Sequence, residues 1–281
     1  MKRGVFMCRK KMIFFTFHLK RVLCLFLFFT VFLLSTCFAF MTYSDEESCK
    51  GGKLAIVIDD FGLQREGVAQ MLGLECKLTV AIMPFLEHTE DDAEDALENG
   101  KEVIIHVPMQ ASYHDPSGYL GPRPIRVTDT EETIKKWVDD AVLELPEAKG
   151  ANIHMGTLCS SKEYIMQPLL EALNGYNHYF VDSKTSGKSV CREVAGEIGI
   201  SFYENHVFLE HEQKNKQYVK KCLTKAMEIA QKRGQCIAIG HVGHEGGRIT
   251  VQAIHEMLPA FHENNIELVF VSELRPLDEN K

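Results

Sequence analysis

Residues 53–62 read KLAIVIDDFG, and this stretch decides the fold. The apolar run from Leu54 to Ile58 is too short for a helix and rich in β-branched side chains, which predicts a strand buried on both faces, as in a parallel sheet. The strand ends in two adjacent carboxylates, Asp59 and Asp60, before a turn glycine, Gly62. In α/β folds, acids at the carboxyl end of a buried strand lie where active sites are built. A helix cap would explain only one of the two acids, because successive strand residues point to opposite sides. The doublet therefore predicts a functional site.

Outward from this strand, apolar runs alternate with amphipathic segments along the rest of the chain. Further strands are expected at residues 77–83, 102–107, 151–154, 178–182, 200–203, 236–241 and 266–272, and helices at residues 89–99, 130–145, 162–173, 215–233 and 251–264. This alternation predicts a parallel α/β fold. A single α/β barrel is ordinary for a chain of 281 residues, so we expect one closed or nearly closed barrel after residue 52.

The first 43 residues have a different character. Seven basic residues fall within the first 21, no acid precedes Asp45, and residues 22–41 form an almost unbroken apolar run. This pattern predicts either a signal peptide or an N-terminal membrane anchor over residues 1–43, followed by a linker over residues 44–52. Because basic flanks stay in the cytoplasm, we expect an exported protein of the periplasm or cell envelope. It would be secreted, or held at the membrane through its N-terminal segment only.

Charge and cysteine usage exclude several classes of function. Without the seven N-terminal basic residues, 24 basic and 39 acidic residues remain, a net charge of −15. Nucleic-acid binding would require a basic face, so no nucleic-acid partner is expected. The nine cysteines include no C-x-x-C pair, which argues against a zinc ribbon and leaves any disulfide pairing open. The sequence also lacks G-x-S-x-G, P-loop and dinucleotide-binding motifs.

Titratable side chains end five of the expected strands. A lone histidine there would more often be structural, but in a barrel all these strand ends converge on one face. Two or three of the side chains could bind a divalent metal, one more could act as a general base, and another as a general acid. His244 could line the mouth of such a site. The strand-end residues, in chain order, are Asp59, Asp60, His106, His154, Asp182 and His241.

The motifs around these residues resemble a known family. Residues 58–62 (IDDFG), 100–109 (GKEVIIHVPM), 152–156 (NIHMG), 180–183 (FVDS) and 239–241 (IGH) follow one another in the order found in the divergent branch of the polysaccharide deacetylase superfamily. The resemblance covers nearly all of residues 53–275. It implies a distorted (β/α) barrel of seven or eight parallel strands over residues 53–281. It also implies a hydrolase that removes acetyl groups from N-acetylated sugars with a divalent metal, for which zinc is expected.

The resemblance also implies a role for each matching residue. Asp59 matches the base that activates water, Asp60 and His106 match metal ligands, and His241 matches the acid that protonates the leaving group. Asn152 and Asp182 would bind substrate or support the ligands from outside.

The chain departs from the family pattern at the remaining ligand. Typical members have a histidine, and divergent members a glutamate, four residues after the first metal histidine, where this chain has Gln110. Gln110 could coordinate only weakly, through its amide oxygen, or support the site from outside. We therefore take His154 as the third ligand. The residue before it is Ile153, where the branch often has an asparagine.

Three hypotheses follow for function. The leading one is an exported, metal-dependent carbohydrate deacetylase-like hydrolase. The alternative, prompted by Gln110, is a barrel whose metal site has been lost and which binds a glycan or an envelope partner without catalysis. A different metal-assisted hydrolase on the same scaffold is the third.

Overall fold

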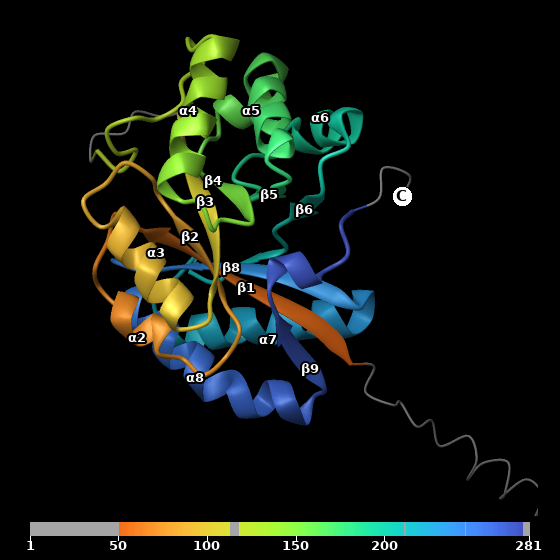
Figure 1. Cartoon of the computed structure of the whole chain (residues 1–281). Helices are drawn as coiled ribbons and strands as arrows, with labels where there is room; N and C mark the ends of the chain where they lie inside the picture. Colours follow the sequence, from red (N-terminus) through yellow and green to blue (C-terminus); the bar gives the residue numbers. More distant parts are fainter. Residues whose placement is uncertain (1–50, 113–117, 211, 245, 278–281) are drawn as a thin grey trace, which may run out of the picture. The chain divides into compact units, whose positions relative to one another are not determined.

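The computed structural model describes residues 51–112, 118–210, 212–244 and 246–277 (Figure 1). The apolar run at residues 22–41 and most of the expected linker lie outside the described residues, so the signal peptide or anchor stays a prediction. Within the described ranges, no helix is both long enough and apolar enough to span a bilayer.

The strands form one parallel sheet that curls into a distorted barrel. Eight of them follow the order β6-β5-β4-β3-β2-β1-β8-β7, and β9 pairs with the first half of β1. Every pairing between these strands is parallel, which confirms the α/β barrel expected from the sequence. The strands are β1 Gly52–Phe61, β2 Thr79–Ile82, β3 Glu102–Met109, β4 Gly150–Met155, β5 Tyr179–Asp182, β6 Phe202–Glu204, β7 Val207–Phe208, β8 Gln235–His241 and β9 Ile266–Val269.

Helices connect the strands and cover the outside of the sheet (Figure 1). They are α2 Val68–Leu72, α3 Thr89–Glu98, α4 Glu131–Glu144, α5 Glu163–Gly175, α6 Cys191–Ile198, α7 Lys216–Arg233 and α8 Gly247–Glu263, with two short 3₁₀ helices, η1 Cys159–Ser161 and η2 Val271–Glu273. The sequence analysis missed α2, α6 and β7, which span five, eight and two residues.

The barrel begins slightly earlier than the sequence suggested. Gly52, expected in the linker, is the first residue of β1. A Cβ atom there would lie 2.4 Å from the main-chain carbonyl carbon of Ala230 in α7, so only glycine allows this close approach.

Side chains alternate between the inside of the barrel and the surrounding helices. Leu54, Ile56 and Ile58 of β1 pack in the large apolar cluster between sheet and helices, whereas Ala55 and Val57 pack in the smaller cluster inside the barrel. Inward-facing positions recur every second residue along a strand. Asp59, His106, Asn152 and His241 therefore continue the inner rows of the barrel, whereas Asp182, two residues after Phe180 of the outer cluster, does not.

The amino-terminal end of the barrel is closed. Glu102 is buried there and accepts hydrogen bonds from the hydroxyls of Tyr179 (2.7 Å) and Thr79 (2.9 Å) and from the backbone N–H of Ser272 (3.3 Å) in η2. The sequence predicted a strand up to residue 272, but the chain turns into η2 instead because the Val271 N–H donates to Thr79 Oγ1 at 3.1 Å.

Candidate active site

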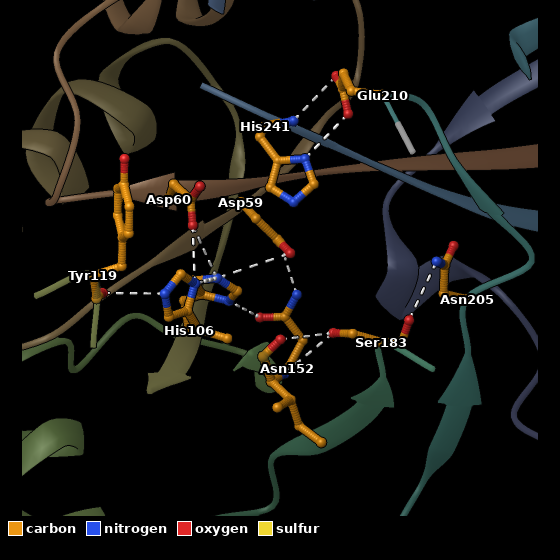
Figure 2. A network of polar contacts seen from close by, with 11 residues as sticks. Asp59, Asp60, His106, Tyr119, Asn152, Ser183, Asn205, Glu210 and His241 are labelled. Atoms are coloured by element: carbon orange, nitrogen blue, oxygen red, sulfur yellow. Dashed lines mark hydrogen bonds and ion pairs between the residues drawn. The ribbon is translucent and has the colours of Figure 1, made fainter. Parts of the chain in front are cut away.

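Parallel pairing brings the strand-end residues together. Asp59 of β1 lies beside His241 of β8, and His106 of β3 lies beside Asn152 of β4. His154 follows Asn152 by two residues and so faces the same side of β4. Figure 2 shows the side chains of Asp59, His106, Asn152 and His241 converging on one region.

Asp60 reaches this region through an unusual backbone conformation. By alternation its side chain would face the helices, together with Ile56 and Ile58. Instead Asp60 adopts a left-handed φ of 73°, and the register between β1 and β2 shifts after Ile58. Such a conformation costs about 1–3 kcal/mol in a non-glycine residue and is often found at functional sites. Here it turns both acids of the doublet toward the same site.

Three candidate ligand atoms meet at Asp60. Its Oδ1 atom lies 3.0 Å from His154 Nδ1 and 3.4 Å from His106 Nε2, and the two ring nitrogens are 3.0 Å apart. All three residues are buried. Asp60 Oδ1 is itself buried, and no described residue donates a hydrogen bond to it. Burial alone would raise the pKa of Asp60, but the two imidazoles, where they carry a proton on the nitrogen that faces it, outweigh this effect and hold the pKa well below its usual range.

The hydrogen-bond partners on the far side of the His106 and His154 rings determine which ring nitrogen of each histidine carries the hydrogen. Asn152 Nδ2 donates to Asp59 Oδ1 at 2.7 Å, which leaves Asn152 Oδ1 facing His106 Nδ1 at 2.6 Å. A carbonyl oxygen only accepts, so His106 Nδ1 donates and its Nε2 presents a lone pair. In the same way, His154 Nε2 donates to the Tyr119 carbonyl oxygen at 3.1 Å, which leaves a lone pair on Nδ1.

Two imidazole lone pairs therefore point at one carboxylate oxygen. This arrangement is repulsive unless a cation lies between the three atoms or a proton is added. Two imidazole nitrogens and one carboxylate oxygen, each ring fixed by a hydrogen bond on its far side, form a donor set that suits zinc and other divalent transition metals. The residues present thus fit a metal ion held by Asp60, His106 and His154.

Asp59 has the properties of a general base. It is buried next to the three ligand residues, with Oδ2 3.8 Å from His106 Nε2. Burial raises the pKa of Asp59, and the neighbouring carboxylate of Asp60 adds to this, against the opposing charges of His106 and His241. A carboxylate with a raised pKa is a stronger acceptor for a proton from water.

His241 is paired with a residue that the sequence analysis missed, Glu210. His241 Nδ1 donates to Glu210 Oε2 at 3.1 Å, and the other Glu210 oxygen accepts from the hydroxyl of Thr250 and, at 3.4 Å, from the His241 N–H. Burial lowers the pKa of His241, but the hydrogen bond and charge of Glu210, together with Asp60 and Asp59, raise it to about 10. The His241 side chain is 23 % exposed. A partly exposed imidazolium can act as a general acid.

A second residue missed by the sequence analysis is Tyr119. Its carbonyl oxygen holds His154, and its hydroxyl bonds to His244 Nε2, with the two rings 5.1 Å apart. Tyr119 thus links His244 to a candidate ligand, and the place of His244 at the mouth of the site stays a prediction. The contact of the Tyr119 carbonyl oxygen with His154 cannot be predicted from the sequence, since every residue has a main-chain carbonyl group. Glu210 leaves a faint signal in the sequence, an acid directly after the apolar run 207–209.

Gln110 and Asp182 contact loops rather than the ligand residues. Gln110 Oε1 accepts the Val127 N–H at 3.2 Å, so its amide oxygen holds the segment that leads into α4. Asp182 accepts from the Ser189 hydroxyl at 2.7 Å and from the Lys184 N–H at 2.8 Å. Burial raises the pKa of Asp182. Both residues shape the surroundings of the site, and a contact of Asp182 with substrate stays a prediction.

Comparisons with known proteins show which family this sequence matches. A family model described as divergent polysaccharide deacetylase matches residues 56–275. A protein of Escherichia coli strain K12 named uncharacterized protein YibQ is 34% identical over 223 residues, which cover 79% of this chain and 67% of that protein. An uncharacterized protein of Haemophilus influenzae is 33% identical over 193 residues, which cover 67% of this chain and 66% of that protein.

Solved structures show the same fold. The uncharacterized protein ATU2773 from Agrobacterium tumefaciens C58 superposes with a TM-score of 0.70 at 20% identity, over 79% of this chain and 89% of that one. The Xyl-CE4 domain of a multidomain xylanase from the hindgut metagenome of Trinervitermes trinervoides gives a TM-score of 0.51 at 14% identity, over 79% and 89% of the two chains. At these identities the likeness is one of fold alone. The family model, however, spans most of the chain and all of its strand-end motifs, and the chain therefore belongs to the divergent polysaccharide deacetylase family.

Proposed function

We propose that this protein is a metal-dependent hydrolase that removes acetyl groups from N-acetylated sugars of a cell-envelope glycan. The observation that carries the proposal is the meeting of Asp60 Oδ1, His106 Nε2 and His154 Nδ1 within 3.4 Å of one another, with Asp59 and His241 beside them. Family membership supports the same class of reaction. The carbohydrate substrate and the metal are inferences from family and geometry together.

The residues divide the work of amide hydrolysis between them. A divalent ion held by Asp60, His106 and His154 would polarise the acetyl carbonyl and make water more acidic. Asp59 takes the proton of the attacking water, and Asn152 keeps its carboxylate in place through the 2.7 Å hydrogen bond. His241, kept protonated by Glu210, gives its proton to the nitrogen of the departing amine. This scheme needs no nucleophilic serine or cysteine.

Gln110 does not argue against catalysis in this scheme. The alternative of a non-catalytic binding barrel arose because this chain lacks the usual ligand four residues after His106. The position of His154 Nδ1, 3.0 Å from Asp60 Oδ1, supports a complete set of three protein ligands without Gln110. A site with three protein ligands keeps one coordination position for water or substrate, as catalytic zinc sites do.

The site of action remains a proposal based on the sequence of residues 1–43. The basic flank and the apolar run favour export, so we place the reaction in the periplasm or cell envelope, on an acetylated glycan.

Acetate release from N-acetylglucosamine oligomers tests the proposal. The full chain, purified in detergent, would be assayed after removal of metal and again after loading with zinc. We expect acetate release with zinc, loss of the activity on chelation, and only background release by the zinc-loaded Asp59→Asn variant. If the zinc-loaded protein releases no acetate from a broad panel of acetylated sugars and instead binds a glycan regardless of chelation, the binding-module alternative is correct.

A further inference from the structure

The turn that contains Asp60 is held by one side chain outside the site. Asp60 and Gly62 both have left-handed backbones, with φ values of 73° and 82°. A Cβ atom on Gly62 would lie 2.7 Å from the Met83 carbonyl oxygen, so the turn packs directly against the chain after β2. The Gly62 N–H donates to Asp92 Oδ2 at 2.7 Å. A residue of α3 thus fixes the backbone two positions after the candidate ligand.

Asp92 binds this segment with both of its carboxylate oxygens. While Oδ2 accepts from Gly62, Oδ1 pairs with the guanidinium of Arg65 in the same loop. The side chain of Asp92 is 0% exposed, whereas that of Arg65 is 47% exposed. A carboxylate buried to this degree is costly unless it is well paired. Its two partners both belong to residues 62–65, which is evidence that its burial serves that loop.

Asp92 does not belong to the site itself. Asn152 bonds to Asp59 and to His106 Nδ1, and the Tyr119 carbonyl oxygen accepts from His154 Nε2, whereas Asp92 bonds to none of these residues. We therefore expect any effect of Asp92 on the site to pass through the loop of residues 60–65.

We infer that Asp92 is a positioning residue for the metal centre: its carboxylate clamps the Gly62 N–H and Arg65 and so holds Asp60 in the left-handed conformation that aims Oδ1 at the two histidines. This inference rests on the proposed metal site. Without the clamp, the turn keeps the backbone hydrogen bonds from Leu63 and Gln64 to the Asp60 carbonyl oxygen (3.3 and 3.2 Å) but loses its hold on the Gly62 N–H, so Asp60 is aimed less firmly at the two histidines. Partners outside the ligand shell usually change metal affinity by about 10–100-fold when removed.

The test is zinc affinity, measured by competition with a chromophoric chelator on the full chain in detergent. We expect Asp92→Ala to weaken zinc binding by about 10–100-fold. Asp92→Asn keeps an acceptor for the Gly62 N–H and should bind zinc closer to wild type than Asp92→Ala does. Asp95→Ala, on an exposed position of the same helix, is the matched control and should bind as wild type. If Asp92→Ala does not fold, Asp92→Leu replaces it, since leucine fills the space and accepts no hydrogen bond.

A purely structural role has a different signature. If folded Asp92→Ala or Asp92→Leu unfolds at a lower denaturant concentration but binds zinc as tightly as wild type, the inference is wrong and the proposed metal site still stands. If the wild type itself binds no zinc, the proposed site fails and this inference fails with it. Measuring the wild type first therefore separates the two failures.

Discussion

His241 Nδ1 lies 3.1 Å from Oε2 of Glu210, a buried carboxylate 31 positions earlier in the chain. The pair joins two strand ends, because Glu210 follows β7 and His241 ends β8. It also sets the charge of the candidate acid, since Glu210 is the main cause that raises the pKa of His241 to about 10 against the effect of burial.

The first prediction concerns Glu210→Gln. A general acid must be protonated, so activity falls as the pH rises through the pKa of His241. Loss of the Glu210 charge should lower that pKa and move the alkaline limb of the kcat/KM profile down by roughly 1–3 pH units. The measurement is acetate release across pH 6–10, with Glu228→Gln on an exposed position of α7 as the control. An alkaline limb that stays in place in Glu210→Gln would show that His241 is not the acid.

The second prediction concerns Asp59→Asn. The amide retains the shape of the side chain but cannot take a proton from water. Turnover should fall by about 10²–10⁴-fold, the usual contribution of a positioned base, while zinc content stays near wild type because Asp60, His106 and His154 are unchanged. Metal analysis and acetate release on the same samples check both parts. Loss of zinc from Asp59→Asn would instead make Asp59 a ligand.

The third prediction concerns Asn152, which joins the base to a ligand. Its amide donates to Asp59 and accepts from His106, so Asn152→Ala should disturb both residues at once. We expect zinc affinity to fall by about 10–100-fold, with a further loss of turnover at saturating zinc. Gln110→Ala is the control, because Gln110 bonds to Val127 rather than to a ligand. Equal zinc affinities in the two variants would contradict the role given to Asn152.

The fourth prediction is a pH dependence of stability that lies outside the site. His206 Nδ1 accepts the N–H of Ile237 at 3.2 Å, which it can do only when neutral. Burial, aided by Arg233, lowers the pKa of His206 below that of an unfolded histidine. The unfolded chain therefore takes up more protons below about pH 6.5, and this contribution to stability is lost as the pH falls through that value. The urea midpoint of wild type should drop more between pH 7.5 and 5.5 than that of His206→Gln. Equal drops would contradict the assignment.

The positions of several candidate site residues could be predicted from the sequence, because the two-residue period of a strand tells which side chains face the inside of the barrel. Asp59, His106 and His241 continue inner rows of the barrel that the apolar runs already mark, and parallel pairing brings those rows together. His154 was inferred as a ligand by substitution for Gln110, and the structure places it next to Asp60.

Three features of the site could not be predicted from the alternation of apolar and polar residues: the position of Asp60, the pairing of Glu210 with His241, and the contact of Asp92 with Gly62. Alternation sends Asp60 to the wrong face of β1, and only its left-handed backbone brings it inside. Glu210 follows a strand of two residues, Val207–Phe208, which is too short to recognise as a strand. The clamp from Asp92 links segments 30 positions apart, and in the sequence Asp92 is one acid among several in an acidic helix.

The central claim is that Asp60, His106 and His154 hold one divalent metal ion. Anomalous diffraction at the zinc edge, from crystals of the zinc-loaded protein, tests it most directly. We predict one strong peak at about 2.0–2.2 Å from Asp60 Oδ1, His106 Nε2 and His154 Nδ1. A zinc-loaded crystal with no peak among these three atoms, or with its strongest peak on other residues, would contradict the account.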